Sequence, residues 1–106
     1  MKKITSMLIA STALLFAGAF SGNGDAVSGT LFYRQSGNWT ELRDPASDRC
    51  YLLSTDALQA QNRTDHKALL YRGTTCNEDQ LETGLAPNET WDGYLTTVKS
   101  VRFEFA

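Results

Sequence analysis

The sequence has few of the side chains that build metal and catalytic sites. Its 106 residues include two cysteines and one histidine, His66. Because a metal site of this kind needs about four ligands, two thiols and one imidazole do not suffice, and we expect no metal ion or other cofactor. A catalytic triad needs three groups that converge on a pocket, whereas a single histidine next to Asp65 is more typical of a hydrogen-bonded turn. We therefore expect no catalytic residue and no enzymatic activity.

An excess of positive charge is also missing. Without Lys2, Lys3 and Asp25, which lie in the N-terminal segment, the ten basic and twelve acidic residues fall to eight and eleven, a net charge of −3. The charges are interspersed along the chain, so that no basic stripe is formed. Since phosphate backbones are bound by such stripes, nucleic acid is not an expected partner.

Long hydrophobic runs are absent except near the N-terminus. The uncharged stretch Met7–Phe20 follows two lysines and is too short to span a bilayer comfortably, which is the pattern of a secretory signal. Cleavage after Ala26 or after Ala19 places small residues at the −3 and −1 positions. We take residues 1–26 as a signal peptide and 27–106 as a secreted, extracellular domain without membrane contact after cleavage. An uncleaved anchor is the alternative.

The two cysteines predict one disulfide, Cys50–Cys76. A domain of the remaining 80 residues buries only about 60% of its unfolded surface and is marginal without reinforcement. In an oxidising compartment an even number of cysteines indicates disulfides, and two cysteines allow a single pairing. The bridge closes a loop of 27 residues, for which the chain-entropy model gives about 3.5 kcal/mol.

Helical periodicity is almost absent from the remainder, where short alternating runs are separated by Gly, Pro, Asn and Asp. One helical turn over Ser54–Leu58 is possible. The runs predict strands over Thr30–Gln35, Trp39–Arg43, Cys50–Leu53, Leu58–Asn62, Ala68–Arg72, Gln80–Thr83 and Val98–Phe105.

A weak internal repeat suggests how the strands are organised. Leu31–Arg34 (LFYR) returns as Leu69–Arg72 (LLYR), 38 positions later. The short strands of the two halves predict two Greek keys, and the expected fold is a small all-β sandwich. Tyr33 and Tyr71 are equivalent in this repeat and are interpreted as structural.

The chain resembles the β/γ-crystallin-type domains, in particular the small secreted single-domain versions of actinomycetes. The resemblance covers most of residues 27–106 and lies in turn and strand chemistry rather than in one diagnostic motif. It implies a fold of two Greek keys. The residues that carry it are Asp44-Pro45, Cys50, Asn62–Asp65, Ala68–Tyr71, Cys76, Leu85–Pro87 and Val98–Phe103.

The chain departs from this pattern at two places. Glu78 stands where the aromatic hairpin of the family has glycine. The stretch Thr96–Ser100 (TTVKS) has threonines where the calcium-binding members carry Asn or Asp, and a lysine charge beside them. This disfavours calcium. The acidic cluster Asn77–Asp79 lacks the spaced ligands of a calcium loop and is interpreted as a solvated hairpin tip.

Three aromatic residues, Trp39, Trp91 and Tyr94, are the candidates for partial exposure. Such side chains form platforms for sugar rings or partner proteins, although in small β-domains they more often pack across strands. We select Trp91, Asp92 and Tyr94, in the segment Trp91–Tyr94, as the candidate recognition loop.

The sequence names no ligand. The first hypothesis is a monomeric extracellular binding or structural module whose partner is a protein or a glycan. The second, implied by resemblance to crystallin-like metalloprotease inhibitors and killer-toxin-like proteins, is peptidase inhibition or action on a cell wall. An inhibitor presents a rigid loop, for which Gly73–Gln80 and Ala86–Tyr94 are the candidates.

Overall fold

The computed structural model describes residues 26–105, which form eight strands and one short 3-10 helix. The all-β prediction is confirmed, and so is the single disulfide. The elements are β2 (Gly29–Arg34), β3 (Thr40–Arg43), β4 (Cys50–Ala57), β5 (Gln59–Thr64), β6 (Ala68–Tyr71), η1 (Glu78–Gln80), β7 (Leu81–Leu85), β8 (Thr90–Asp92) and β9 (Val98–Phe103).

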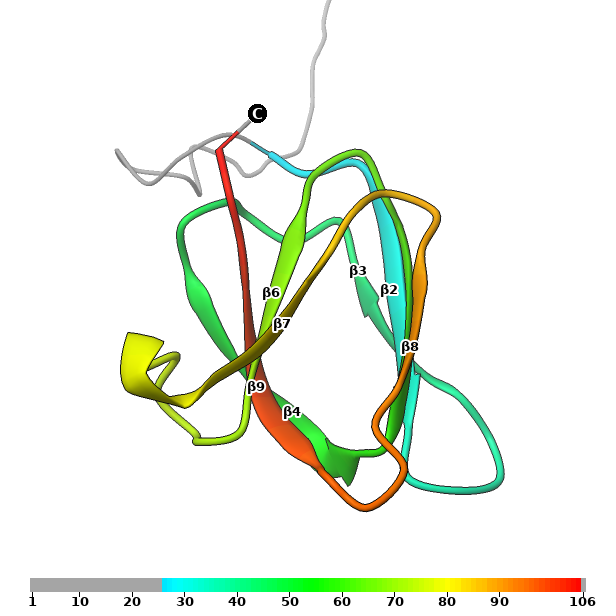
Figure 1. Ribbon diagram of the computed structural model, residues 1–106. Coiled ribbons are helices and arrows are strands. Elements are labelled where there is room, and N and C mark those ends of the chain that lie inside the picture. The colour runs from blue at the N-terminus through cyan, green and yellow to red at the C-terminus, as the bar shows by residue number, and fades with distance from the viewer. Residues whose placement is uncertain (1–25, 106) are drawn as a thin grey trace, which may run out of the picture.

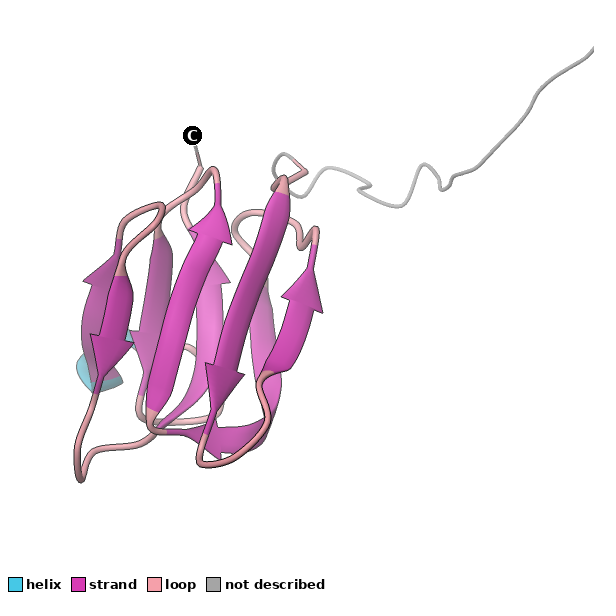
Figure 2. Cartoon of the chain, turned by 90° about the vertical axis from the view of Figure 1, so that its right-hand side faces the viewer, coloured by secondary structure: helices cyan, strands magenta, loops and turns pink. Residues whose placement is uncertain are grey.

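The strands form two antiparallel four-stranded sheets that pack as a sandwich (Figure 1). The first sheet has the order β3-β2-β5-β8 and lies in front in Figure 2, and the second has the order β4-β9-β6-β7. In each half of the chain the first, second and fourth strands share one sheet, while the third strand joins the other sheet. These are two Greek keys that exchange their third strands, so that neither sheet is complete without both halves.

The core lies between the sheets and follows the two-residue alternation of the strands. Tyr33 reaches across it, because its hydroxyl accepts a hydrogen bond from the Ser54 backbone N–H (3.1 Å) and lies 2.9 Å from the Ser54 hydroxyl on β4 of the opposite sheet. Tyr33 thereby ties the two layers together. The other buried members of the core are Val27, Leu31, Leu53, Ala57, Ala60, Ala68, Leu70, Leu85, Val98, Val101 and Phe103.

Tyr33 and Tyr71 are both buried, as their structural interpretation requires, but they are not equivalent. Tyr33 lies opposite Ala60 and faces the core, whereas Tyr71 lies opposite Ser100, on the outside of the second sheet and apart from the core cluster. In β6 it is Leu70 that faces the core. The predicted repeat is therefore wrong by one residue, and a shift of one residue exchanges the two faces of a strand.

The segment that follows β6 covers the outside of the second sheet. Arg72 N–H donates to Gln80 O (2.8 Å) and closes the segment at its base. The buried Ser100 hydroxyl donates to Gly73 O (2.7 Å) and accepts from Cys76 N–H (3.1 Å). The Cys50–Cys76 disulfide fastens the same segment to β4. We call Gly73–Gln80 the tethered loop. The disulfide thus holds a loop onto one sheet and does not join the two sheets.

Two local predictions are wrong. Ser54–Leu58 forms no helical turn, because β4 continues to Ala57 with an irregularity in its pairing to β9 after Leu52. Alternating burial along this strand and the cross-sheet bond at Ser54 favour extended backbone. Strand β8 was not predicted; it occupies the first part of the segment taken as a recognition loop.

The predicted signal peptide lies outside the described residues except for Ala26, which forms an isolated bridge with Ala46. Val27 is buried in the core, and its N–H donates to Pro45 O (2.8 Å). Over the range 26–105, no helix has the length and apolar character needed to cross a membrane. Secretion stays a prediction.

Candidate binding face

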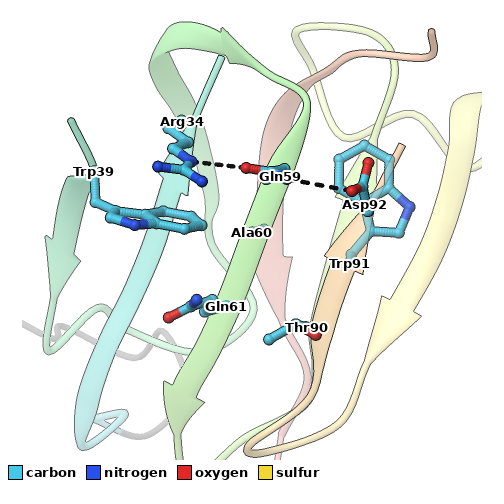
Figure 3. A pocket seen from close by; sticks show the side chains of 8 residues that line it. All are labelled: Arg34, Trp39, Gln59, Ala60, Gln61, Thr90, Trp91 and Asp92. Atoms are coloured by element: carbon cyan, nitrogen blue, oxygen red, sulfur yellow. Dashed lines mark hydrogen bonds between the residues drawn. The ribbon is translucent and has the colours of Figure 1, made fainter. Parts of the chain in front are cut away.

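A hollow of about 230 Å³ lies on the outside of the first sheet, over β2, β5 and β8 (Figure 3). We call it the Trp39 hollow. Its position places it on the face of the sheet opposite to the core. Its lining residues are Arg34, Trp39, Gln59, Ala60, Gln61, Thr90, Trp91 and Asp92.

Strand register brings three polar side chains to one level of this face. Arg34 on β2 is paired with Gln59 on β5, which is paired with Asp92 on β8. Their chain neighbours Tyr33 and Ala60 face the core, so these three side chains point outward. Residues that are distant in the sequence therefore meet across three adjacent strands.

The three side chains are joined by hydrogen bonds. Arg34 Nε donates to Gln59 Oε1 (2.7 Å), and Gln59 Nε2 donates to Asp92 Oδ2 (3.2 Å), as the dashed lines of Figure 3 show. We call Arg34, Gln59 and Asp92 the polar ladder. Because a guanidinium and a carboxylate stand at its two ends, the ladder carries no net charge.

Trp39 is held against the ladder. The guanidinium carbon of Arg34 lies 4.2 Å from the centre of the indole ring, a cation–π contact, and Arg34 Nη1 donates to Gly37 O (2.9 Å). Arg34 therefore fixes both the ring and the loop that carries it. In Figure 3 Arg34 lies on one side of the indole and Gln61 on the other. The half-buried ring is thus oriented before any ligand arrives.

A second hollow of about 340 Å³ adjoins the first at the end of the sheet. We call it the Tyr94 hollow. It shares Arg34, Gln59 and Asp92 with the Trp39 hollow, so the polar ladder forms the wall between them. Its other lining residues are Gln35, Ser36, Gly37, Leu58 and Tyr94.

The predicted recognition residues have three different environments. Trp91 lies opposite Ala60 in β8 and is packed partly against the core, so its ring is not a free platform. Asp92 belongs to the polar ladder, and its Oδ1 accepts from Tyr94 N–H (3.0 Å). Tyr94 is 81% exposed, with a positive φ of 54°. The structure thus brings Asp92 and Tyr94 to the Tyr94 hollow, whereas Trp91 lines the Trp39 hollow together with Asp92 and is packed partly against the core.

Gly93 allows this arrangement of the Trp91 ring. A Cβ atom at Gly93 would collide with the ring of Trp91 and with the carbonyl oxygen of Thr96. Gly93 N–H donates to Leu58 O (2.8 Å), and Thr96 N–H donates to Gly93 O (2.8 Å). These bonds anchor the turn from which Tyr94 projects.

Arg34 and Gln59 were not predicted as site residues, and Trp39 was not preferred to Trp91. Alternation along β2 and β5 predicts that the side chains of Arg34 and Gln59 point away from the core, and this much could be found from the sequence. The pairing of β2 with β5 over 25 positions is not a local property. The ladder could not be assembled without it.

His66 is buried in the turn between β5 and β6. Its Nδ1 lies 2.7 Å from Asp65 Oδ1, and Nε2 has no hydrogen-bond partner among residues 26–105. The hydrogen bond with His66, and then that from Ser28 N–H, lower the pKa of the Asp65 carboxyl. His66 therefore bonds the turn through Asp65.

The acidic cluster Asn77–Asp79 is exposed and lies in the loop of the β6–β7 hairpin, as predicted, next to the start of β7. Glu78 and Asp79 begin η1, and the Asn77 side chain caps this helix by accepting from Asp79 N–H (3.0 Å). In the described part of the chain, no group of three or more His, Cys, Asp or Glu side chains is placed to hold a metal ion.

The fold and these contacts define the protein as a β-sandwich of two Greek keys with two adjoining hollows, lined by aromatic and polar side chains, on one sheet. No known protein family, curated protein or solved structure matches the chain. Membership of the β/γ-crystallin-type family stays a prediction.

Proposed function

We propose that the protein is a non-catalytic extracellular binding domain that recognises its ligand through the Trp39 hollow. The observation that carries the proposal is the oriented indole of Trp39, stacked by Arg34 and adjoining the polar ladder. Ligand sites combine apolar and aromatic surface with a few fixed polar groups. In the Trp39 hollow both occur together, and the adjoining Tyr94 hollow shares the same three polar side chains.

Preorganisation supports the proposal. Binding costs free energy when side chains must be ordered, and less when they are already held. Here Arg34 is held by Gln59 and Gly37, and Gln59 is held by Asp92. The side chains of the ladder are therefore ordered in the free protein, although they lie on an open sheet surface.

Replacement of Trp39 by alanine is expected to weaken binding by about tenfold or more, because a buried aromatic contact is the typical anchor of such a site. The measurement is co-sedimentation of the folded protein with insoluble extracellular polymers, with peptidoglycan, chitin, cellulose and an immobilised protein matrix in parallel. Circular dichroism checks that the Trp39→Ala variant keeps its strand content.

Leu52→Ala is the matched control, since Leu52 is 67% exposed and lies on the second sheet. It is expected to bind as the unaltered protein does. Retention that survives Trp39→Ala, or that is lost equally in Leu52→Ala, contradicts a site at the Trp39 hollow. The same conclusion follows if none of the four materials retains the protein.

Peptidase inhibition is the second candidate, and the tethered loop favours it. This loop is closed at its base, capped at Asn77 and bonded to the buried Ser100, and Cys76 has a positive φ of 52°. Such a loop resists distortion in a protease cleft. The second candidate segment, Ala86–Tyr94, contains strand β8 and is less suited to insertion.

If the tethered loop inhibits, the protein should titrate a secreted metallopeptidase at a one-to-one ratio, and Thr75→Pro should abolish this without loss of the fold, because Thr75 is exposed in the loop. The control is Ser36→Pro, in the exposed β2–β3 loop. Thr90→Pro is not suitable as a control, because Thr90 lies in strand β8. Absence of stoichiometric inhibition across peptidase classes eliminates this candidate.

A further inference from the structure

The Trp39 hollow and the Tyr94 hollow are two parts of one groove. They meet at the polar ladder, whose three side chains line both. One aromatic ring lies at each side of the ladder, the indole of Trp39 and the exposed phenol of Tyr94. A ligand that contacts both rings must therefore be elongated and must pass over the ladder.

Several polar groups along this groove have no hydrogen-bond partner among residues 26–105. The Gln61 amide, the Thr90 hydroxyl and Nη2 of Arg34 form no hydrogen bond with any other described residue. Gln61 and Thr90 line the Trp39 hollow on the side away from the ladder, as Figure 3 shows. These groups offer both donors and acceptors to a ligand that lies between the polar ladder on one side and Gln61 and Thr90 on the other.

Charge along the groove selects against ionic ligands. An anion that reaches Arg34 also meets the carboxylate of Asp92, and a cation attracted by Asp92 meets the guanidinium of Arg34. Both groups are already bonded to Gln59. A neutral ligand rich in hydroxyl groups is repelled by neither Arg34 nor Asp92, and its hydroxyls can pair with the remaining donors and acceptors of the groove.

We infer that the groove binds a linear neutral oligosaccharide, with one sugar ring on Trp39 and the next on Tyr94. A pyranose ring has an apolar face of C–H groups and a rim of hydroxyls. These match an aromatic ring beside planar amide, guanidinium and carboxylate groups. The inference rests on the proposed function, for which it names the class of ligand and the number of subsites.

The size of the groove agrees with two sugar-binding subsites. The hollows of about 230 and 340 Å³ each lie near or below the lower end of the range for sites of drug-sized ligands, about 300–1,000 Å³. Each therefore suits a unit as small as one sugar ring. A chain that occupies both subsites gains from the linkage, because the second contact becomes intramolecular.

The test is isothermal titration with gluco-, manno-, xylo- and chito-oligosaccharides, from single sugars to hexasaccharides, and with oligouronates of matched length. Affinity is expected to rise by about tenfold or more between the single sugar and the longer neutral oligomers, and oligouronates are expected to bind more weakly. Trp39→Ala and Tyr94→Asn should each remove the dependence on chain length. Asparagine is chosen because it tolerates the positive φ of Tyr94. Leu52→Ala should leave the dependence unchanged.

The outcomes separate this inference from the proposed function. If insoluble polymers retain the protein through Trp39 but none of the neutral oligosaccharides binds, or affinity does not change with length, the inference is overturned and the proposed function stands. Tighter binding of oligouronates also overturns it. If Trp39→Ala changes neither retention nor titration, both fail. A Tyr94→Asn variant that keeps the full length dependence rejects the second subsite.

Discussion

Replacement of both cysteines by serine, Cys50→Ser with Cys76→Ser, is expected to lower the free energy of unfolding by about 3.5 kcal/mol. The free energy is lost because the unfolded chain regains the freedom of a closed loop of 27 residues. For a domain of this size the thermal midpoint should fall by roughly 15–25 °C. Urea titration and calorimetry of the two proteins at the same pH measure both quantities.

The position of the disulfide predicts where the damage is greatest. The tethered loop loses its attachment to β4, so the hydrogen bonds of Ser100 to Gly73 and Cys76 are left to hold it. Tyr71, buried beneath this region on the outside of the second sheet, gains access to water. We expect the amide of Cys76 to lose its protection against hydrogen exchange first.

Amides of the first sheet provide the internal control. The pairing of β2 with β5 includes neither Cys50 nor Cys76. Protection of these amides against hydrogen exchange should therefore fall only as far as the global free energy of unfolding falls. An unchanged midpoint, or equal loss of local protection in both sheets, is incompatible with a disulfide that acts on the tethered loop. Binding at the Trp39 hollow should persist in the folded fraction of the variant.

Asn62→Ala is expected to lower the free energy of unfolding by about 3 kcal/mol, since several buried polar groups would lose their partners at once. Asn62 is fully buried, and its Nδ2 donates to the carbonyl oxygens of His66 and Leu85, both at 2.8 Å. Its Oδ1 accepts from the N–H of Thr64 (3.1 Å) and from the Thr64 hydroxyl (2.6 Å). One side chain thus links β5, the following turn and the end of β7.

The backbone of Asn62 reinforces this point. Its N–H donates to Glu89 O (2.9 Å), and its carbonyl accepts from Asn88 N–H (2.6 Å). The Asn62 side chain thus joins β5 of the first sheet to the end of β7 in the second sheet. The backbone of the same residue joins β5 to the residues just before β8. Removal of the side chain should affect both halves of the sandwich.

Asn38→Ala is the matched control, because Asn38 is exposed in the β2–β3 loop, and its effect should stay within about 0.5 kcal/mol. Asn62→Asp is the diagnostic variant: it keeps the shape but replaces the donors by a carboxylate facing two carbonyl oxygens. At neutral pH it should be at least as destabilising as alanine. Equal urea midpoints for Asn62→Ala and Asn38→Ala would show that the buried network contributes little.

Local pattern was sufficient for much of the strand assignment. The strand predicted over Val98–Phe105 is observed as β9 over Val98–Phe103, with Val101 and Phe103 fully buried. The prediction was too long by two residues, and Phe105 is 56% exposed. The short runs LFYR and ALLY were correctly assigned to strands. Strand β8 was missed because its three residues, Thr90–Asp92, are too few to show a period and are followed by the turn residue Gly93.

The functional residues were harder to predict. Trp39 and Trp91 each stand between two polar residues in the sequence, and no local feature separates them. Their roles differ because Trp91 is paired with core-facing Ala60, whereas Trp39 lies just before β3 and stacks with Arg34. That difference depends on strand register. Asp92 was selected from the sequence, but its hydrogen-bond partner Gln59 was not.

By itself the sequence determined the all-β class and the Cys50–Cys76 pairing, since a two-residue alternation is a local property and two cysteines admit one bond. Tertiary structure alone decided that the third strands are exchanged, that the disulfide tethers a loop, and that Arg34, Gln59 and Asp92 meet. The physical reason is that pairing between distant strands is fixed by which faces pack together in the core. A shift of one residue in the register of β5 would turn Gln59 inward and break the polar ladder.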